Sequence, residues 1–301
     1  MDITLTLKCN NNCVFCPRKD YLKTIACTSL KEAYNDIRKM RLLHEEIVLS
    51  GGEVTLLDEL PAIISFCQEL GFKNIGIITN GRPLKNIKLA EKYILAGVKD
   101  FAVSIYSVDD TIHDLITRNK GSGQDSKRGL ANLLRLSVRY PINIRVNIVL
   151  NYWNHKDINN TLKALYAAGV RNFILAEQVI MRKKDKHLSL EQITRSLAGI
   201  RTLKLNNTRL VLRGFPLCLP ETPDRSVPEG LILKEKDPLI LLEKHEVDTL
   251  IKERSRKQKY LKKFEHLFVK VKKCRNCDWK NNCKGFQKLY LEKPGKKDQK
   301  R

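Results

Sequence analysis

Short β-branched runs alternate with helix-like segments over the first 180 residues, and this alternation constrains the fold more than any other feature of the sequence. Each run is bounded by Gly, Asn or Pro, as strand ends usually are. The predicted strands are residues 3–7, 46–50, 74–79, 101–105, 143–150 and 172–176. The predicted helices are residues 30–43, 57–70, 86–95, 126–140 and 157–168. Six β-then-α units in a row predict parallel strands joined by right-handed crossovers.

Two arrangements fit six such units: a partial barrel and an open, doubly wound sheet. Periodicity alone does not distinguish them. Gly71 and Gly169 each follow a predicted helix and precede a strand, which is the expected chemistry of a helix C-terminus. The fold class predicted at this stage is therefore α/β with a parallel sheet.

The pattern changes after about residue 185. Residues 188–203 are predicted to be helical and residues 209–213 to form a strand, whereas residues 214–230 are rich in Pro and Gly. A basic amphipathic stretch follows over residues 238–273, and the last residues are polar. A length of 301 residues favours one large α/β domain with a smaller C-terminal addition.

The composition is that of an ordinary soluble protein, with 42% hydrophobic and 30% charged residues. No apolar run reaches the roughly 18 to 20 residues that a membrane helix needs, and residues 1–7 do not resemble a signal peptide. We therefore expect a cytoplasmic protein without a membrane partner. Six of the nine cysteines fall into two tight groups, and in a reducing compartment such groups favour metal binding over disulfides.

The net charge of +23 is concentrated in the second half of the chain. Residues 1–180 contain 24 Lys and Arg against 18 Asp and Glu, whereas residues 181–301 contain 32 against 15. A basic half can indicate a nucleic-acid partner or an acidic substrate. The alternative is a solvated, lysine-rich helix face.

The first cysteine group is Cys9-x3-Cys13-x2-Cys16, directly after the first predicted strand. Three thiolates in one short loop can hold one face of a cubane iron–sulfur cluster and leave the fourth iron without a protein ligand. Zinc is the alternative, but it would normally need a fourth ligand nearby, and none lies closer in sequence than Cys27.

This motif, with Phe15 before the last cysteine, resembles the signature of the radical S-adenosylmethionine (SAM) superfamily. The resemblance implies a partial (β/α)6 TIM-like barrel over residues 1–185 and a 4Fe–4S cluster on Cys9, Cys13 and Cys16. It implies that the open iron is chelated by SAM. Reductive cleavage of SAM would then give a 5′-deoxyadenosyl radical that abstracts hydrogen. The electron donor would be a protein such as flavodoxin or ferredoxin.

Further segments at predicted strand ends resemble SAM-binding segments of the same family. Gly51-Gly52-Glu53 resembles the segment that receives the methionine amino group, since backbone acceptors and Glu53 can bind an ammonium. Arg118 is predicted to bind the SAM carboxylate in bidentate fashion. The other predicted SAM contacts are Asn80 and Ser104, and Asn147 and Asn151, on and after the fifth strand, are predicted to meet the ribose. Glu177, after the sixth strand, is a further candidate.

The second cysteine group is Cys274-x2-Cys277-x5-Cys283-x-Gly285, and it resembles the auxiliary-cluster regions called SPASM and twitch domains. A full SPASM domain needs more cysteines after Cys283, and the sequence has none, so one extra 4Fe–4S cluster is the limit. The resemblance makes Cys218 the fourth ligand. It places a small C-terminal cysteine-rich auxiliary-cluster domain at residues 186–290, before a basic disordered tail at 291–301. A zinc knuckle with the same ligands is the alternative.

The sequence therefore predicts a radical SAM enzyme that modifies a peptide or protein side chain or a small-molecule precursor. A radical SAM enzyme that modifies RNA, such as tRNA, is the first alternative, because the C-terminal half is basic. A basic zinc-binding module without enzymatic activity is the second. Cys67 is expected to lie in the core, and Cys27 could be structural or functional.

Overall fold

The computed structural model describes residues 2–16, 29–216, 218–219, 232–234, 267–277, 280–281 and 283–291. One parallel sheet of eight strands dominates it, with strand order β1-β2-β3-β4-β5-β6-β7-β8. The strands are β1 (Asp2–Thr6), β2 (Glu46–Gly51), β3 (Asn74–Thr79), β4 (Asp100–Ser104), β5 (Asn143–Leu150), β6 (Asn172–Glu177), β7 (Arg209–Arg213) and β8 (Ile232–Lys234). Because neighbours in the sheet are also neighbours in sequence, every connection runs in one direction around it.

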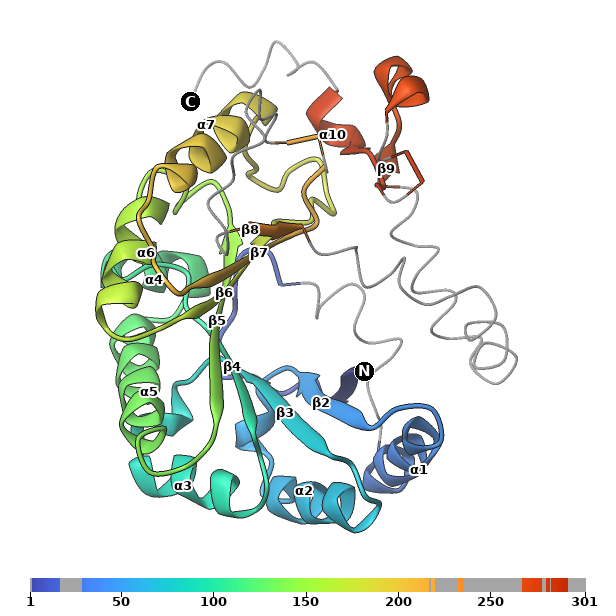
Figure 1. Ribbon diagram of the computed structural model, residues 1–301, viewed down its shortest axis with the longest axis vertical. Coiled ribbons are helices and arrows are strands. Elements are labelled where there is room, and N and C mark those ends of the chain that lie inside the picture. The colour runs from blue at the N-terminus through green and yellow to red at the C-terminus, as the bar shows by residue number, and fades with distance from the viewer. Residues whose placement is uncertain are drawn as a thin grey trace.

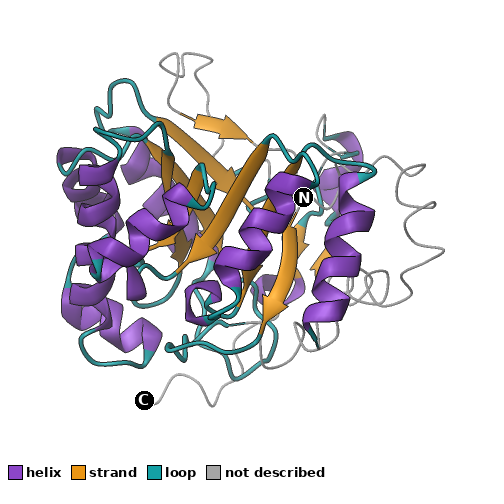
Figure 2. Ribbon diagram, turned by 90° about the horizontal axis from the view of Figure 1, so that it is seen from below, coloured by secondary structure: helices purple, strands orange, loops and turns teal. Residues whose placement is uncertain are grey.

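The helices cover the convex side of the curved sheet and leave the concave side facing inward (Figure 1). They are α1 (Leu30–Arg41), α2 (Leu60–Glu69), α3 (Ile87–Leu95), α4 (Asp110–Thr117), α5 (Ser122–Leu136), α6 (Ile158–Ala167) and α7 (Leu190–Arg201), with 3₁₀ turns η3 (Val54–Leu56) and η4 (Pro83–Lys85). Figure 2 shows the same layer of helices around the strands from below. The partial TIM-like barrel is confirmed, and the doubly wound sheet, which needs helices on both faces, is excluded.

Strand β5 has an apolar outer face and a more polar inner face. In β5 the side chains of Ile144, Val146, Ile148 and Leu150 are buried in the core, whereas the residues between them are less buried. Alternate residues of a strand point to opposite faces of a sheet, so Asn147 lies on the inner face of the barrel. Its partner across the ladder in β4 is Ser104.

The sequence predicted most elements to within a few residues. Strands β3 and β5 have the predicted bounds, and the positive φ angles of Gly71 and Gly169, 81° and 105°, confirm the two helix ends. Helix α4 was not predicted, because eight residues are too few for a clear apolar period. Its start is a local signal, since the Asp109 carboxylate accepts hydrogen bonds from the N–H groups of Thr111 and Ile112.

The sheet continues beyond residue 185. Strand β7 pairs in parallel with β6, from Asn172 with Arg209 to Ala176 with Arg213, and β8 pairs with β7. Strand pairing thus joins the first part of the predicted C-terminal region to the barrel sheet. Most of the predicted amphipathic stretch, residues 238–266, and the tail after Leu291 lie outside the described residues, as does Cys27.

The second cysteine group lies in a small C-terminal unit, described here over residues 267–291 with gaps and called the C-terminal cysteine segment. It contains the antiparallel pair β9 (Phe268–Val269) and β10 (Phe286–Gln287), the 3₁₀ turn η5 (Lys272–Asn276) and helix α10 (Lys288–Leu291). Within the described part of the chain, no helix is long and apolar enough to cross a membrane.

Candidate functional site

The candidate site lies where the carboxyl ends of β1 to β4 meet. The cysteine loop, residues 7–16, follows β1 and carries Cys9, Cys13 and Cys16, all partly exposed and free of disulfides. Gly51 ends β2, Asn80 follows β3 and Ser104 ends β4. Parallel strands place their carboxyl ends at one edge of the sheet, so residues far apart in sequence meet beside the cysteine loop.

The backbone of the cysteine loop is bonded to the last turn of α4. The N–H of Asn12 donates to the carbonyl of Thr117, and the N–H of Val14 donates to the carbonyl of Ile116, both at 2.9 Å. Arg118 ends this helix in the left-handed conformation, with φ of 52°. The helix that the sequence did not predict therefore supports the loop that carries the cysteines.

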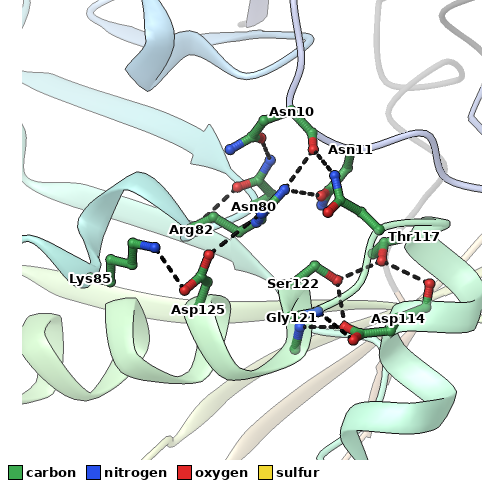
Figure 3. Close-up of polar contacts among 12 residues, drawn as sticks. Asn10, Asn11, Asn80, Arg82, Lys85, Asp114, Thr117, Gly121, Ser122 and Asp125 are labelled. Carbon is green, nitrogen blue, oxygen red and sulfur yellow. Dashed lines mark hydrogen bonds and ion pairs between the residues drawn. The ribbon is translucent and has the colours of Figure 1, made fainter.

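Three polar side chains also hold this loop, Asn80 and Arg82 after β3 and Asn119 just after α4, and we call them the loop brace; Figure 3 labels Asn80 and Arg82. The Arg82 guanidinium donates to the Asn10 carbonyl at 2.6 Å and to Asn11 Oδ1 at 2.9 Å. Asn80 Nδ2 donates to Asn10 Oδ1 at 2.6 Å, and Asn119 Nδ2 donates to the Asn10 carbonyl at 2.5 Å. Sequence reasoning treated the three asparagines between the first two cysteines only as spacers.

Helix α5 anchors the loop brace through Asp125. Its carboxylate lies 3.4 Å from Arg82 Nη2 and 2.9 Å from Lys85 Nζ, so it orients the Arg82 guanidinium toward the loop (Figure 3). Asp114 fixes the turn between α4 and α5 by accepting from the N–H groups of Gly121 and Gly123 at 2.5 and 2.8 Å. The carboxylates of Asp125 and Asp114 thus help to hold the cysteine loop in place.

The Gly51-Gly52-Glu53 segment also packs on the cysteine loop. The N–H of Gly52 donates to the Thr6 carbonyl, and the N–H of Glu53 donates to the Lys8 carbonyl, both at 2.7 Å. A Cβ atom on Gly52 would overlap the Lys8 carbonyl oxygen. Glycine is therefore required here by a close approach of two backbones.

The Glu53 carboxylate is fully buried and ties β2 to β3. It accepts from Thr79 Oγ1 and the Asn80 N–H, each at 2.6 Å, and from the Thr55 hydroxyl and N–H. Burial raises the pKa of Glu53, although these hydrogen bonds oppose the rise. The predicted contact of the backbone acceptors and Glu53 with an ammonium group stays a prediction; in the structure the Glu53 carboxylate is already engaged by these hydrogen bonds.

The inner face of the barrel presents the next two predicted residues. Ser104 and Asn147 are ladder partners on this face. The Asn147 Oδ1 atom is buried and has no hydrogen-bond partner among the described residues. An unpaired buried acceptor is costly, so this atom suits a ligand with a donor group, such as a ribose hydroxyl.

The remaining predicted SAM contacts are less well placed. Arg118 is exposed at the end of α4. Asn151 is fully buried, and its side chain is bonded within its own turn, to the Val149 carbonyl and the Trp153 N–H. Glu177 lies on the outer side of β6, beside its ladder partner Leu150, where it accepts a hydrogen bond from Tyr290. Asn151 and Glu177 are thus both engaged in hydrogen bonds within the protein, and their contact with SAM stays a prediction.

Tyr106 was missed by sequence reasoning, and it explains the aromatic residue of the motif. Its ring meets the Phe15 ring edge-on at 5.1 Å and stacks on the His113 ring at 5.4 Å. Its hydroxyl is hydrogen-bonded to the thiol of Cys13 and to Ser104. Phe15 thus packs the cysteine loop against the segment that follows β4.

The cysteine loop has the chemistry of a metal-cluster site. Burial raises the pKa of Cys13 to about 12, and the charges of Cys16 and Cys9 add to the rise. Three thiolates this close to one another are unfavourable unless a cationic group compensates them. The donor set therefore fits a 4Fe–4S cluster with one open iron. Among the residues that the structure describes, no three Cys, His, Asp or Glu side chains converge on a single metal ion.

The four predicted auxiliary ligands lie close enough for three of the thiols to influence the pKa of the fourth. Burial raises the pKa of Cys218, and the charges of Cys283, Cys277 and Cys274 raise it further. The Gly285 N–H donates to Cys283 Sγ at 3.3 Å. Four cysteine thiolates suit a 4Fe–4S cluster and also suit structural zinc.

Cys67 is a core residue, as expected. It is fully buried in α2 within the hydrophobic core, and burial alone raises its pKa to about 12. It therefore lies outside both cysteine groups.

The unfolding free energy is expected to fall as pH rises through the titration of Glu177. Burial raises the pKa of Glu177 from 4.5 to about 7, against hydrogen bonds from Tyr290 and Gln287 that lower it. The folded state then binds this proton more tightly than the unfolded state does. The stabilisation that this proton gives the folded state is complete below pH 4.5 and is lost as pH rises through about 7. The unfolding free energy then falls by about 3 kcal/mol.

Denaturant unfolding of the wild type and of Glu177→Gln at pH 5 and pH 8 measures this effect. The variant keeps an acceptor for Tyr290 but does not titrate. The wild type should lose about 2 to 3 kcal/mol more than the variant between the two pH values. Equal losses would show that Glu177 has an ordinary pKa.

Comparison with known proteins identifies the family. The model of the radical SAM superfamily matches residues 3–165, more than half of the chain. The chain therefore belongs to the radical SAM superfamily and is an enzyme of that class. The family implies a 4Fe–4S cluster and SAM as cofactors.

The curated relatives match only part of the chain. A probable GTP 3′,8-cyclase of Sulfolobus acidocaldarius is 36% identical over 120 residues, which cover 38% of this chain and 36% of the relative. An S-adenosylmethionine-dependent nucleotide dehydratase of Selenomonas ruminantium is 28% identical over 158 residues, which cover 51% of this chain and 57% of the relative. The chain thus spans about half or less of the length of these relatives.

Solved structures match more of the chain at lower identity. The structure of anSMEcpe with bound AdoMet and Cp18Cys peptide has a TM-score of 0.63 and 15% identity, and the match covers 96% of this chain and 88% of that one. Streptococcus suis SuiB bound to S-adenosylmethionine has a TM-score of 0.61 and 17% identity, with 96% and 73% covered. At such identities the likeness shows the fold alone.

Proposed function

We propose that Cys9, Cys13 and Cys16 hold the 4Fe–4S cluster at which SAM is reductively cleaved. The supporting observation is the cysteine loop itself, which α4, the loop brace and the Gly51–Gly52 turn all hold at the carboxyl edge of the barrel. When bound, the cluster and SAM supply a 5′-deoxyadenosyl radical for hydrogen abstraction. An electron donor such as flavodoxin or ferredoxin would supply the electron.

The residues of this chain would bind and orient SAM. The backbone carbonyls of the Gly51–Gly52 turn would accept from its ammonium group, and Arg118 would pair with its carboxylate. Asn147 Oδ1 would accept from a ribose hydroxyl, with Ser104 beside it. Asn80 would act differently, because its side chain is already bonded to Asn10 and to the Arg82 N–H, so it would hold the loop.

The C-terminal thiols would hold a second 4Fe–4S cluster. Support comes from the mutual influence of Cys218, Cys274, Cys277 and Cys283 and from the number of thiolates, which matches the usual ligand set of such a cluster. Zinc on the same four thiolates is the outcome that metal analysis would reveal in its place.

For the substrate we favour a phosphorylated small molecule over a peptide or an RNA. A cavity of about 530 Å³ lies beside Cys274, and Lys270, Lys272, Arg275 and Lys280 line it. The described residues of the lining include no acid, and such a group of cations suits a phosphate group. In addition, two relatives are named for reactions of nucleotides, a GTP cyclase and a nucleotide dehydratase.

Metal analysis with a SAM-cleavage assay tests the proposal. Anaerobically purified protein should contain about eight irons per chain and form 5′-deoxyadenosine with dithionite. About four irons with cleavage would keep the SAM site and remove the second cluster. Zinc without iron or cleavage would overturn both. Substrate class is then tested with nucleoside triphosphates, a peptide and tRNA, by which of them accelerates 5′-deoxyadenosine formation.

A further inference from the structure

The C-terminal cysteine segment meets the barrel through one buried side chain, Gln287, which is 1% exposed. Its Nε2 donates to the Gln178 carbonyl at 2.8 Å, and its Oε1 accepts from the Ile180 N–H at 2.7 Å. An amide side chain here pairs with a backbone carbonyl and a backbone N–H two residues apart. It thereby replaces the hydrogen bonds that a neighbouring strand would supply beyond the end of β6.

A second contact lies next to the first. The Tyr290 hydroxyl donates to Glu177 Oε1 at 2.8 Å, and Gln287 Nε2 lies 3.2 Å from the same hydroxyl. The Tyr290 ring packs against the hydrophobic core, with its centroid 6.1 Å from that of His187. Hydrogen bonds and apolar packing therefore both hold Gln287 and Tyr290 against the end of β6. These residues lie some 110 positions beyond that strand in the sequence.

The path from Gln287 back to the cysteines is short and constrained. Gly285 has a φ of 88°, and a Cβ atom on it would overlap the Val269 carbonyl oxygen. Phe286 pairs with Val269 across the two short strands, and the Gly285 N–H donates to Cys283 Sγ. The position of Cys283 relative to the barrel therefore follows from the position of Gln287.

The fourth thiol approaches from the barrel side. Cys218 lies in the segment after β7. Its pKa is raised by burial and by the charges of Cys283, Cys277 and Cys274, so these thiols lie near one another. The C-terminal cysteine segment thus lies over the carboxyl ends of β6 and β7. The cysteine loop after β1 lies at the same edge of the sheet, because all eight strands are parallel.

We propose that Gln287 is a positioning residue that seats the C-terminal cysteine site on the barrel edge, at a set distance from the Cys9–Cys16 loop. This inference rests on the proposed function, because it gives the seated site its role: a second cluster facing the SAM cluster across the substrate space. Tyr290 supports this position through its hydrogen bond to Glu177, and we call the contacts of Gln287 and Tyr290 with residues 177–180 the seat. Loss of the Gln287 amide would leave the Ile180 N–H and the Gln178 carbonyl unpaired in a buried environment, which is costly.

Hydrogen–deuterium exchange of the whole chain tests the contacts of the seat in the absence of substrate. In Gln287→Ala the amide of Ile180 should exchange about tenfold faster or more, because its acceptor is gone. Gln124→Ala, the same change at an exposed position of α5, should leave it unchanged. Exchange at Ile180 as slow as in the wild type would overturn the inference.

A spectroscopic signature separates positioning from stability alone. With both clusters reconstituted and reduced, their magnetic interaction should broaden the electron paramagnetic resonance lines of the wild type and of Gln124→Ala. In Gln287→Ala the broadening should fall while the iron content stays the same. Unchanged broadening in a variant that has lost the Ile180 protection would also overturn the inference.

Two further measurements keep the inference falsifiable. If Gln287→Ala is insoluble, Tyr290→Phe removes a single hydroxyl of the same seat and should speed exchange over residues 177–180; unchanged exchange there would contradict the seat. If metal analysis finds zinc on the C-terminal thiols, the proposed second cluster fails. The exchange experiment then still decides whether Gln287 seats the segment.

Discussion

Replacing Cys13 by alanine is expected to abolish SAM cleavage and to lower the iron content by about four per chain. The surroundings of Cys13 disfavour a lone thiolate, since burial raises its pKa to about 12 and the charges of Cys16 and Cys9 add to the rise. Two thiolates would remain, which do not hold a cubane cluster. The readouts are iron content and dithionite-driven formation of 5′-deoxyadenosine.

Cys67→Ala is the matched control for this experiment. It also removes a single thiol, but one that lies on α2, is fully buried in the core and is outside both cysteine groups. We expect some loss of stability from the cavity and unchanged iron content and cleavage. Cleavage retained by Cys13→Ala, or lost by Cys67→Ala with the fold intact, would contradict the assignment of the cluster ligands.

Gly52→Ala is expected to have the second largest effect, with loss of most SAM cleavage from a protein that still folds. The added Cβ would overlap the Lys8 carbonyl oxygen and lie 2.8 Å from the carbonyl carbons of Leu7 and Lys8. These neighbours are backbone atoms, which no rotamer change can move. The turn and the cysteine loop must therefore separate, at a cost of about 1 to 3 kcal/mol.

The experiment compares Gly52→Ala with Gly199→Ala in iron content, SAM affinity and unfolding free energy. Gly199 lies within α7, and its added Cβ would meet only the end of the Asn159 side chain, which can rotate away. The control should keep full cleavage and gain up to about 1 kcal/mol of stability, because alanine favours a helix. Full cleavage by Gly52→Ala would show that the turn does not support the cysteine loop.

Elements with a strong period were predictable because local sequence decides them. In β5 the alternation of apolar and polar residues matches the two faces of the sheet, so its bounds were predicted without error. Helix α4 was missed because eight residues do not establish a helical period. The continuation of the sheet through β7 was not predicted either, since the strand was recognised but its partner was not.

The cysteine spacing indicated the site, but not what holds it in place. Arg82 and Asn10 are 72 residues apart, and their hydrogen bond exists only because the loop after β3 reaches the loop after β1. Glu53 is a second residue whose surroundings depend on contacts between segments far apart in sequence. Its predicted contact with an ammonium group stays a prediction, but its burial and its four hydrogen bonds, which tie the segment after β2 to β3, are seen only in the structure.

The sequence by itself determined the order of the first seven strands and of the longer helices between them, the two groups of thiols and the family, because each depends on residue types at short spacings. Only the tertiary structure decided which side chains support the cysteine loop and how the C-terminal cysteine segment meets β6. Gln287 carries no sequence signal of its role. Its role arises because folding buries its amide beside a carbonyl and an N–H that would otherwise have no partner.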